Sequence, residues 1–149
     1  MFRRHAVGSI ENELVYASEQ LAMRSERDGD IHLIALAGVL DIDSAPAFEV
    51  ELKRVERSDA SEIVVDLSGL EWISSDGLKA LIHAHSRSRE RSNRLRLLPG
   101  SDQVQRTFET AGLVSRLPFD DDRELRLQVR SQSPRANVVL SRPVRHWRR

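Results

Sequence analysis

Two adjacent serines, Ser74 and Ser75, followed by Asp76 and Gly77, are the residues of this chain best placed to do chemistry. An apolar run ends just before them, and apolar residues at helical spacing begin at Leu78. The hydroxyls therefore lie where a helix is predicted to start. Free backbone N–H groups and the positive end of the helix dipole favour an anion there, so this position suits a phosphate carried by a serine.

The same residues have simpler structural interpretations. Serine is a preferred N-cap residue, and position alone makes capping the simpler role for both hydroxyls. Asp76 is interpreted as an acid in the first helical turn that complements the dipole, and a permanent mimic of phosphate is the weaker alternative. Trp72 is either an anchor that faces a partner or a side chain packed beneath the loop, and the sequence does not decide between them.

Other kinds of chemistry find no support in the residues. The chain has no cysteine, which excludes disulfides and cysteine–zinc sites. His83 and His85 are two apart on a predicted helix and do not face each other, so no metal site is expected. Neither a serine–histidine–acid triad nor a glycine-rich phosphate loop is apparent. We therefore predict a protein that is not an enzyme, with no cofactor and no metal.

Length and charge point to one domain with tails. A chain of 149 residues corresponds to a single domain, and the net charge is zero. Residues 123–149 hold eight arginines against one acid, Glu124, a net charge of +7. No segment approaches the ~20 apolar residues needed to span a bilayer, and no apolar stretch follows the basic pair near the N-terminus. A cytoplasmic protein without membrane insertion is expected.

The order of elements predicts an α/β fold. Strands are expected around Leu21, over 31–36, over 63–67 and over 95–98. Helices are expected on the face formed by Phe48, Leu52 and Val55, over 78–91, and before Gly112. The resulting β-β-α-β-α-β-α order implies a mostly parallel sheet of four to five strands. Gly69 and Gly77 are expected in turns.

Three regions follow from this pattern. Residues 1–18 are predicted to be an N-terminal extension, residues 19–120 the domain, and residues 121–149 a basic, arginine-rich tail. The tail is interpreted first as a solvated segment that needs no function. The alternative is a polybasic arm that contacts nucleic acid or an acidic surface, including that of its own domain, through salt-sensitive contacts.

From about residue 21 to residue 119 the chain resembles a STAS domain, the fold of bacterial anti-sigma factor antagonists. Four local features carry the resemblance, in the right order: the Gly-x-Leu-Asp pattern at 38–41, the strand 64–67, the loop 73–78 and the helix end at 108–113. The loop is similar to the family's Asp-Ser-Ser/Thr-Gly-Leu phosphorylation loop. It departs from that pattern because serine stands at 74 and aspartate at 76.

The resemblance implies a binding module that pairs with an anti-sigma factor of kinase-type ATPase fold and so regulates transcription indirectly. It places the phosphorylated serine on Ser75 and leaves Ser74 as the cap. The partner surface is expected to include the following residues: Asp41, Asp43, Ser44, Trp72, Ser74, Ser75, Asp76, Gly77 and Lys79.

Two other functions stay open. The chain is alternatively a STAS scaffold subunit of a stress-signalling assembly or of a lipid or anion transporter. It is alternatively a nucleic-acid-binding protein that acts through its basic tail. Self-association into a homodimer is also left open.

Overall fold

The computed structural model describes residues 10–120, which form a five-stranded sheet and three helices. The predicted fold class is confirmed. In chain order the elements are β1 (Ile10–Ala17), β2 (Leu21–Asp28), β3 (Ile31–Leu40), α2 (Ala45–Glu56), β4 (Glu62–Ile73), α3 (Ser75–Ser88), β5 (Arg94–Leu98) and α4 (Asp102–Thr110). The predicted basic tail, 121–149, lies outside the described residues.

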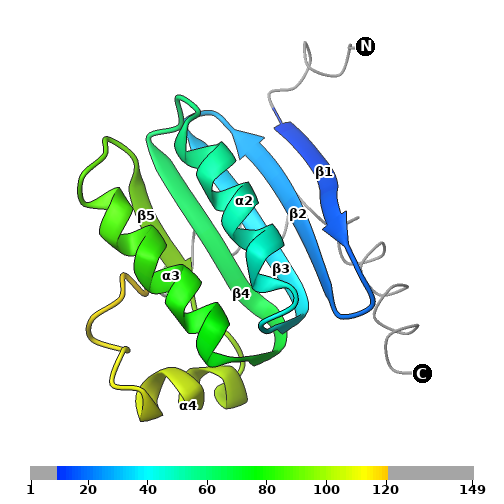
Figure 1. Ribbon diagram of the computed structural model, residues 1–149. Coiled ribbons are helices and arrows are strands. Elements are labelled where there is room, and N and C mark those ends of the chain that lie inside the picture. Colours follow the sequence, from blue (N-terminus) through cyan, green and yellow to red (C-terminus); the bar gives the residue numbers. More distant parts are fainter. Residues whose placement is uncertain (1–9, 121–149) are drawn as a thin grey trace.

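The sheet is mixed, and the expectation of a mostly parallel sheet was wrong. The strands lie in chain order from β1 to β5. β1, β2 and β3 pair antiparallel, whereas β3, β4 and β5 pair parallel. Figure 1 shows β1 at one edge of the sheet and β5 at the other. The parallel half carries the crossover helices α2 and α3, because parallel neighbours cannot be joined by a tight turn.

Strand β1 lies within residues 1–18, the range that the sequence analysis assigned to an N-terminal extension. Residues 10–17 form an edge strand whose ladder with β2 runs from the pair Ile10↔Asp28 to the pair Ala17↔Ala22, with a register shift between Leu14 and Tyr16. The polar run at 11–13 and the irregular register hide the period-2 pattern in the sequence. The strand is held by backbone pairing with β2, which local periodicity does not report.

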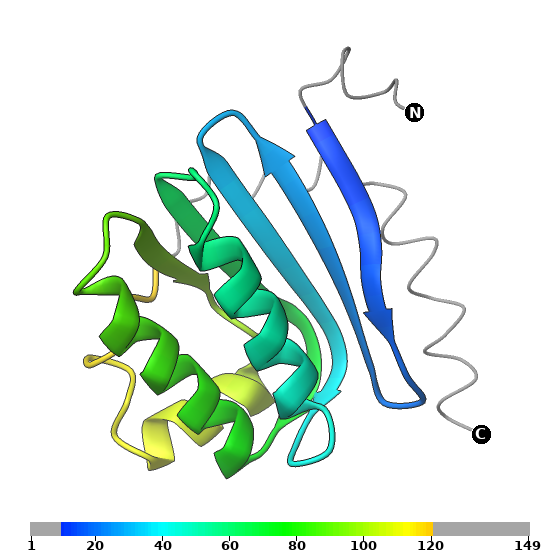
Figure 2. The same cartoon turned by 45° about the horizontal axis from the view of Figure 1, so that its top comes forward.

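All three helices contribute to one hydrophobic core on one side of the sheet. Helices α2 and α3 cover the same face, as both cartoon views show (Figures 1 and 2). The predicted apolar face of α2 is confirmed, since Phe48, Leu52 and Val55 are fully buried. Helix α4 adds Val104 and Phe108 to the same cluster, and Phe108 meets Phe119 edge to face at 4.9 Å between ring centroids. No described helix is long and apolar enough to cross a membrane.

A second, smaller cluster lies on the opposite face of the sheet. It consists of Leu33, Val64 and Leu98, with Ile31 packed against it. These side chains come from three neighbouring strands, β3, β4 and β5. Because successive side chains of a strand point to opposite faces, Val64 faces away from the helices while Ile63 and Val65 face them.

The two glycines expected in turns lie inside regular elements, so that expectation was wrong. Gly69 is part of β4, which continues to Ile73 through residues predicted to be a turn. A Cβ atom on Gly69 would lie 2.6 Å from the carbonyl oxygen of Leu36. The missing side chain therefore lets β3 and β4 approach each other. Gly112, with φ +73°, follows the C-cap of α4 as predicted.

Candidate functional site

The two loops expected to contact a partner lie at the same end of the sheet, where β3 and β4 have their carboxyl ends. Strands β3 and β4 are parallel, and their last residues, Leu40 and Ile73, are paired. The backbone N–H of Ser74 donates to the carbonyl oxygen of Leu40 at 2.8 Å, which ties the second loop to the end of β3. Residues 41–44 and residues 74–77 therefore start from adjacent points, as the carboxyl ends of parallel strands do in α/β sheets.

The two serines of the second loop have different environments. The Ser74 hydroxyl accepts the backbone N–H groups of Asp76 at 3.1 Å and of Gly77 at 3.3 Å. Ser74 is thus the N-cap of α3. Ser75 is the first residue of α3; it is exposed, and its hydroxyl forms no hydrogen bond with any described residue. Only Ser75 offers a hydroxyl that is not already used by the fold.

Gly77 is buried beneath the loop and offers no surface to a partner. It lies buried in the first turn of α3. A Cβ atom at this position would lie 2.7 Å from Cγ1 of Ile73 and 2.9 Å from Cγ of Leu40. The glycine therefore allows the start of α3 to pack directly on the ends of β3 and β4, which sets the height of Ser75 above the sheet edge.

The first loop is held by its own side chains. A carboxylate oxygen of Asp41 accepts the backbone N–H groups of Asp43 at 3.0 Å and of Ser44 at 3.2 Å. The Ser44 hydroxyl donates to the carbonyl oxygen of Val39 at 3.1 Å, and its residue is only 2 % exposed. In this structure Ser44 has no side-chain surface for a partner, so its role is to fix the loop. Asp43 and Ile42 are the exposed residues.

A groove of about 700 Å³ runs between the start of α3 and helix α4. Trp72, Ser75 and Leu78 line one side, and Gln103, Arg106 and Thr110 line the other. Trp72 is 45 % exposed, so it is a surface residue that lines the groove and is not buried beneath the loop. The groove thus combines an aromatic wall, a free hydroxyl and a cation.

Arg106 is a candidate site residue that sequence analysis missed. It is exposed, lines the groove together with Ser75, and forms no ion pair with the described residues. In the sequence it is one of several polar residues on an amphipathic helix and has no motif around it. Only the packing of α4 beside the start of α3 reveals that Arg106 and Ser75 line the same groove.

The described residues show no group of three metal-ligating side chains. Nδ1 of His83 lies 3.8 Å from one carboxylate oxygen of Glu49, and an Nη of Arg87 lies 3.5 Å from the other. His85 is on the same helix, and its partial burial, with a smaller contribution from nearby Arg89, lowers its pKa from the ordinary value. This surface therefore joins α2 to α3 and has no features of a chemical site.

Comparison with known proteins agrees with this geometry. A family model described as "Mlab, STAS domain" matches residues 23–118. The anti-sigma-B factor antagonist of Listeria monocytogenes is 32 % identical over 88 residues, which cover 59 % of this chain and 77 % of that protein. This chain belongs to the STAS domain family, and the sequence-based assignment is confirmed.

Solved structures extend the agreement to the fold. An anti-sigma factor antagonist from Mycobacterium paratuberculosis matches with a TM-score of 0.65 and 21 % identity, over 77 % of this chain and 97 % of that one. The antagonist SpoIIAA in its unphosphorylated form matches with a TM-score of 0.56 and 18 % identity, over 83 % of this chain and 97 % of that one. At these identities the likeness concerns the fold.

Proposed function

We propose that this protein is an anti-sigma factor antagonist that binds an anti-sigma factor of kinase-type ATPase fold and is released by phosphorylation of Ser75. The observation that carries the proposal is the contrast between the two loop serines. The Ser74 hydroxyl caps helix α3, whereas the Ser75 hydroxyl is exposed and forms no hydrogen bond with the described residues. The relative that shares 32 % identity carries the name anti-sigma-B factor antagonist.

A phosphate on Ser75 is compatible with the fold. It adds about −1.5 to −2 charges at neutral pH. Ser75 is the first residue of α3, where the helix dipole favours negative charge and Asp76 already lies in the first turn. The domain should therefore stay folded after modification, and the switch should act on the interface.

The interface we propose is centred on Ser75 and takes in both loops and the groove. Its exposed members are Asp43, Trp72, Ser75 and Lys79. Trp72 supplies the aromatic anchor that often dominates binding energy. Arg106 adds a cation on the other wall of the groove. Asp41, Ser44, Ser74 and Gly77 contribute by holding this surface in shape.

Phosphorylation would disrupt this interface through charge. The added phosphate would stand next to Asp76 on a surface that loses water when the partner binds. A charge that loses water on binding and gains no partner across the interface costs several kcal/mol. We expect the dissociation constant to rise by about 100-fold or more.

The test is calorimetric titration of a purified anti-sigma factor of this class with four forms of the full chain. These are the unmodified protein, Ser75→Ala, Ser75→Glu and Ser86→Glu. Ser86 is an exposed serine of the same helix α3, so Ser86→Glu adds the same charge away from the proposed interface. Binding by all forms except Ser75→Glu supports the proposal.

A second measurement tests the modification itself. The partner is incubated with the protein and ATP, which supplies the phosphoryl group, and the modified residue is mapped by mass spectrometry. Phosphate on Ser75 is expected, and none in Ser75→Ala. Phosphate on another residue, together with equal binding by Ser75→Glu and Ser86→Glu, would overturn the switch.

The description of the matching family model, "Mlab, STAS domain", keeps one alternative in view. A STAS scaffold subunit of a transporter or of a stress-signalling assembly would hold its partner regardless of charge at Ser75. Co-purification of one large assembly with the unmodified protein and with Ser75→Glu alike would favour that function.

A further inference from the structure

Helix α4 turns a polar stripe toward the start of α3. Val104 and Phe108 are fully buried in the core, which fixes how the helix is rotated. The residues of α4 that line the groove recur at helical spacing: Gln103, Arg106, Thr107 and Thr110. Among the described residues that line the groove, Arg106 alone is charged. A cation therefore lies on the wall across from Ser75, the residue that we propose to be modified.

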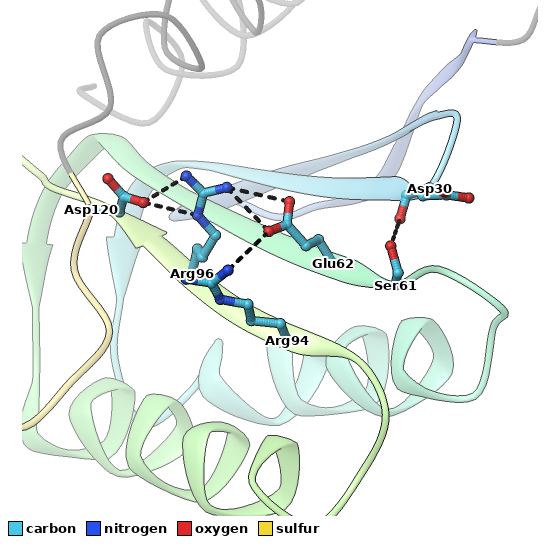
Figure 3. A network of polar contacts seen from close by, with 6 residues as sticks. All are labelled: Asp30, Ser61, Glu62, Arg94, Arg96 and Asp120. Atoms are coloured by element: carbon cyan, nitrogen blue, oxygen red, sulfur yellow. Dashed lines mark hydrogen bonds and ion pairs between the residues drawn. The ribbon is translucent and has the colours of Figure 1, made fainter.

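Arg106 forms no ion pair with the described residues, in contrast to several other arginines of the domain. On β5, for example, Arg96 donates to both carboxylate oxygens of Glu62, at 3.2 Å and 3.3 Å (Figure 3). Asp102 and Glu109 lie one helical turn before and after Arg106, yet within the described part of the chain neither is paired with it. The exposed guanidinium is thus open to an anion that enters the groove.

A phosphate on Ser75 would find few donors at the start of the helix, because the cap already uses them. The backbone N–H groups of Asp76 and Gly77 donate to the Ser74 hydroxyl at 3.1 Å and 3.3 Å. The backbone N–H of Leu78 donates to the Ser74 carbonyl oxygen at 3.0 Å. Helix N-termini bind phosphate through such groups. The anion therefore needs a side-chain donor, and a guanidinium meets phosphate with two parallel hydrogen bonds.

We propose that Arg106 receives the phosphate of phosphorylated Ser75 within the same chain, so that the modification closes the groove between α3 and α4. The inference rests on the proposed function for the identity of the modified residue. Trp72 and Leu78 give the groove apolar walls, and apolar surroundings strengthen an ion pair by limiting its hydration. Phosphorylation would then act twice on the interface, because it adds negative charge and also withdraws a cation and the groove from the partner.

Lys79 is the competing cation. It lies four residues after Ser75 on α3, the spacing at which an acid and a lysine meet on a helix surface. A phosphate paired with Lys79 would stay on its own helix and leave the groove open. The planar fork of Arg106 favours the pair across the groove, since an exposed ion pair with a lysine contributes little. The experiment has to separate these two partners.

The test is the pH titration of the phosphate in the full chain, followed by phosphorus NMR. Phosphoserine is placed at position 75 during translation, so neither a kinase nor a partner is required. Phosphoserine titrates at a pH of about 6, and a neighbouring cation lowers this midpoint. We expect Arg106→Gln to raise the midpoint by about 0.5 pH unit or more and Lys79→Gln to raise it by less. Arg106→Lys, which keeps the charge, should restore most of the difference.

Phosphoserine at position 86 is the matched control. Ser86 is exposed on α3 and is not among the residues that line the groove, so Arg106→Gln should leave the titration of its phosphate unchanged.

Three results would overturn the proposal. In the first, Arg106→Gln does not change the midpoint of phosphoserine at 75. In the second, Lys79→Gln raises it as much as Arg106→Gln or more, which means that the phosphate pairs along its own helix. In the third, Arg106→Gln raises the midpoints at 75 and 86 equally, as a change in net charge alone would do. Partner binding that is insensitive to Ser75→Glu would contradict the proposed function instead, because the titration contains no partner.

Discussion

Arg87 of α3 forms a two-pronged ion pair with Glu56 of α2. Its Nε donates to one carboxylate oxygen at 2.8 Å, and an Nη donates to the other at 3.0 Å. The Glu56 side chain is only 4 % exposed, and hydrogen bonding to Glu56 is the main cause that raises the pKa of Arg87. This ion pair therefore joins the two helices that cover the sheet. If Arg87 were removed, the buried Glu56 carboxylate would have neither a partner nor access to water.

Replacement of Arg87 by methionine should destabilise the protein by about 3 kcal/mol, because it leaves a buried carboxylate unpaired. The free energy of unfolding in urea measures this. Arg91→Met, at an exposed position beyond the same helix, is the control and should cost less than about 0.5 kcal/mol. Adding Glu56→Gln to Arg87→Met should recover part of the loss. Equal losses of unfolding free energy in Arg87→Met and Arg91→Met would contradict a stabilising role for the Arg87–Glu56 ion pair.

The two loop serines should differ in stability experiments as they differ in environment. Ser74→Ala removes the cap of α3 and should cost about 1 kcal/mol. Ser75→Ala removes a hydroxyl that makes no bond to the described residues and should change stability by less than about 0.5 kcal/mol. Thermal unfolding of both variants provides the comparison. A larger loss for Ser75→Ala than for Ser74→Ala would show that the roles are reversed.

Gly77→Ala should destabilise the domain even though alanine is the better helix former by about 1 kcal/mol. The added methyl group would meet Ile73 at 2.7 Å and Leu40 at 2.9 Å, and overpacking of this kind costs about 1–3 kcal/mol. The change should also displace the start of α3 and weaken partner binding. Ser86→Ala on the same helix is the control and should be nearly neutral. Unchanged stability and binding in Gly77→Ala would mean that Leu40 and Ile73 can move aside.

His85 should make the fold less stable in mild acid. Burial and Arg89 lower its pKa in the folded state, so the unfolded chain binds the proton more strongly. The contribution of His85 is fully present above the unfolded pKa of about 6.5 and is lost as the pH falls toward the lowered folded value. Unfolding in urea at about pH 7.5 and about pH 5.5 should show a smaller loss in His85→Gln than in the unmodified protein. The same loss in both would contradict the prediction.

Elements with a local signature were predictable from the chain alone. Phe48, Leu52 and Val55 recur at helical spacing, so α2 and its buried face could be placed. Ser74 stands before an apolar helical pattern and proved to be the cap. In these cases the residues that determine the structure lie within one or two turns of each other. The family motif in the loop carried the assignment of Ser75 as the proposed switch.

The tertiary structure decided what depends on residues far apart in the chain. β1 is a strand because β2 pairs with its backbone, and its own residues show no strand period. Ser44 looked like a surface residue but is buried under its own loop. Ser75 and Arg106 line the same groove because α4 packs beside the start of α3. Sequence periodicity reports which face of an element is apolar, whereas partners across a sheet or groove are selected by packing of the whole chain.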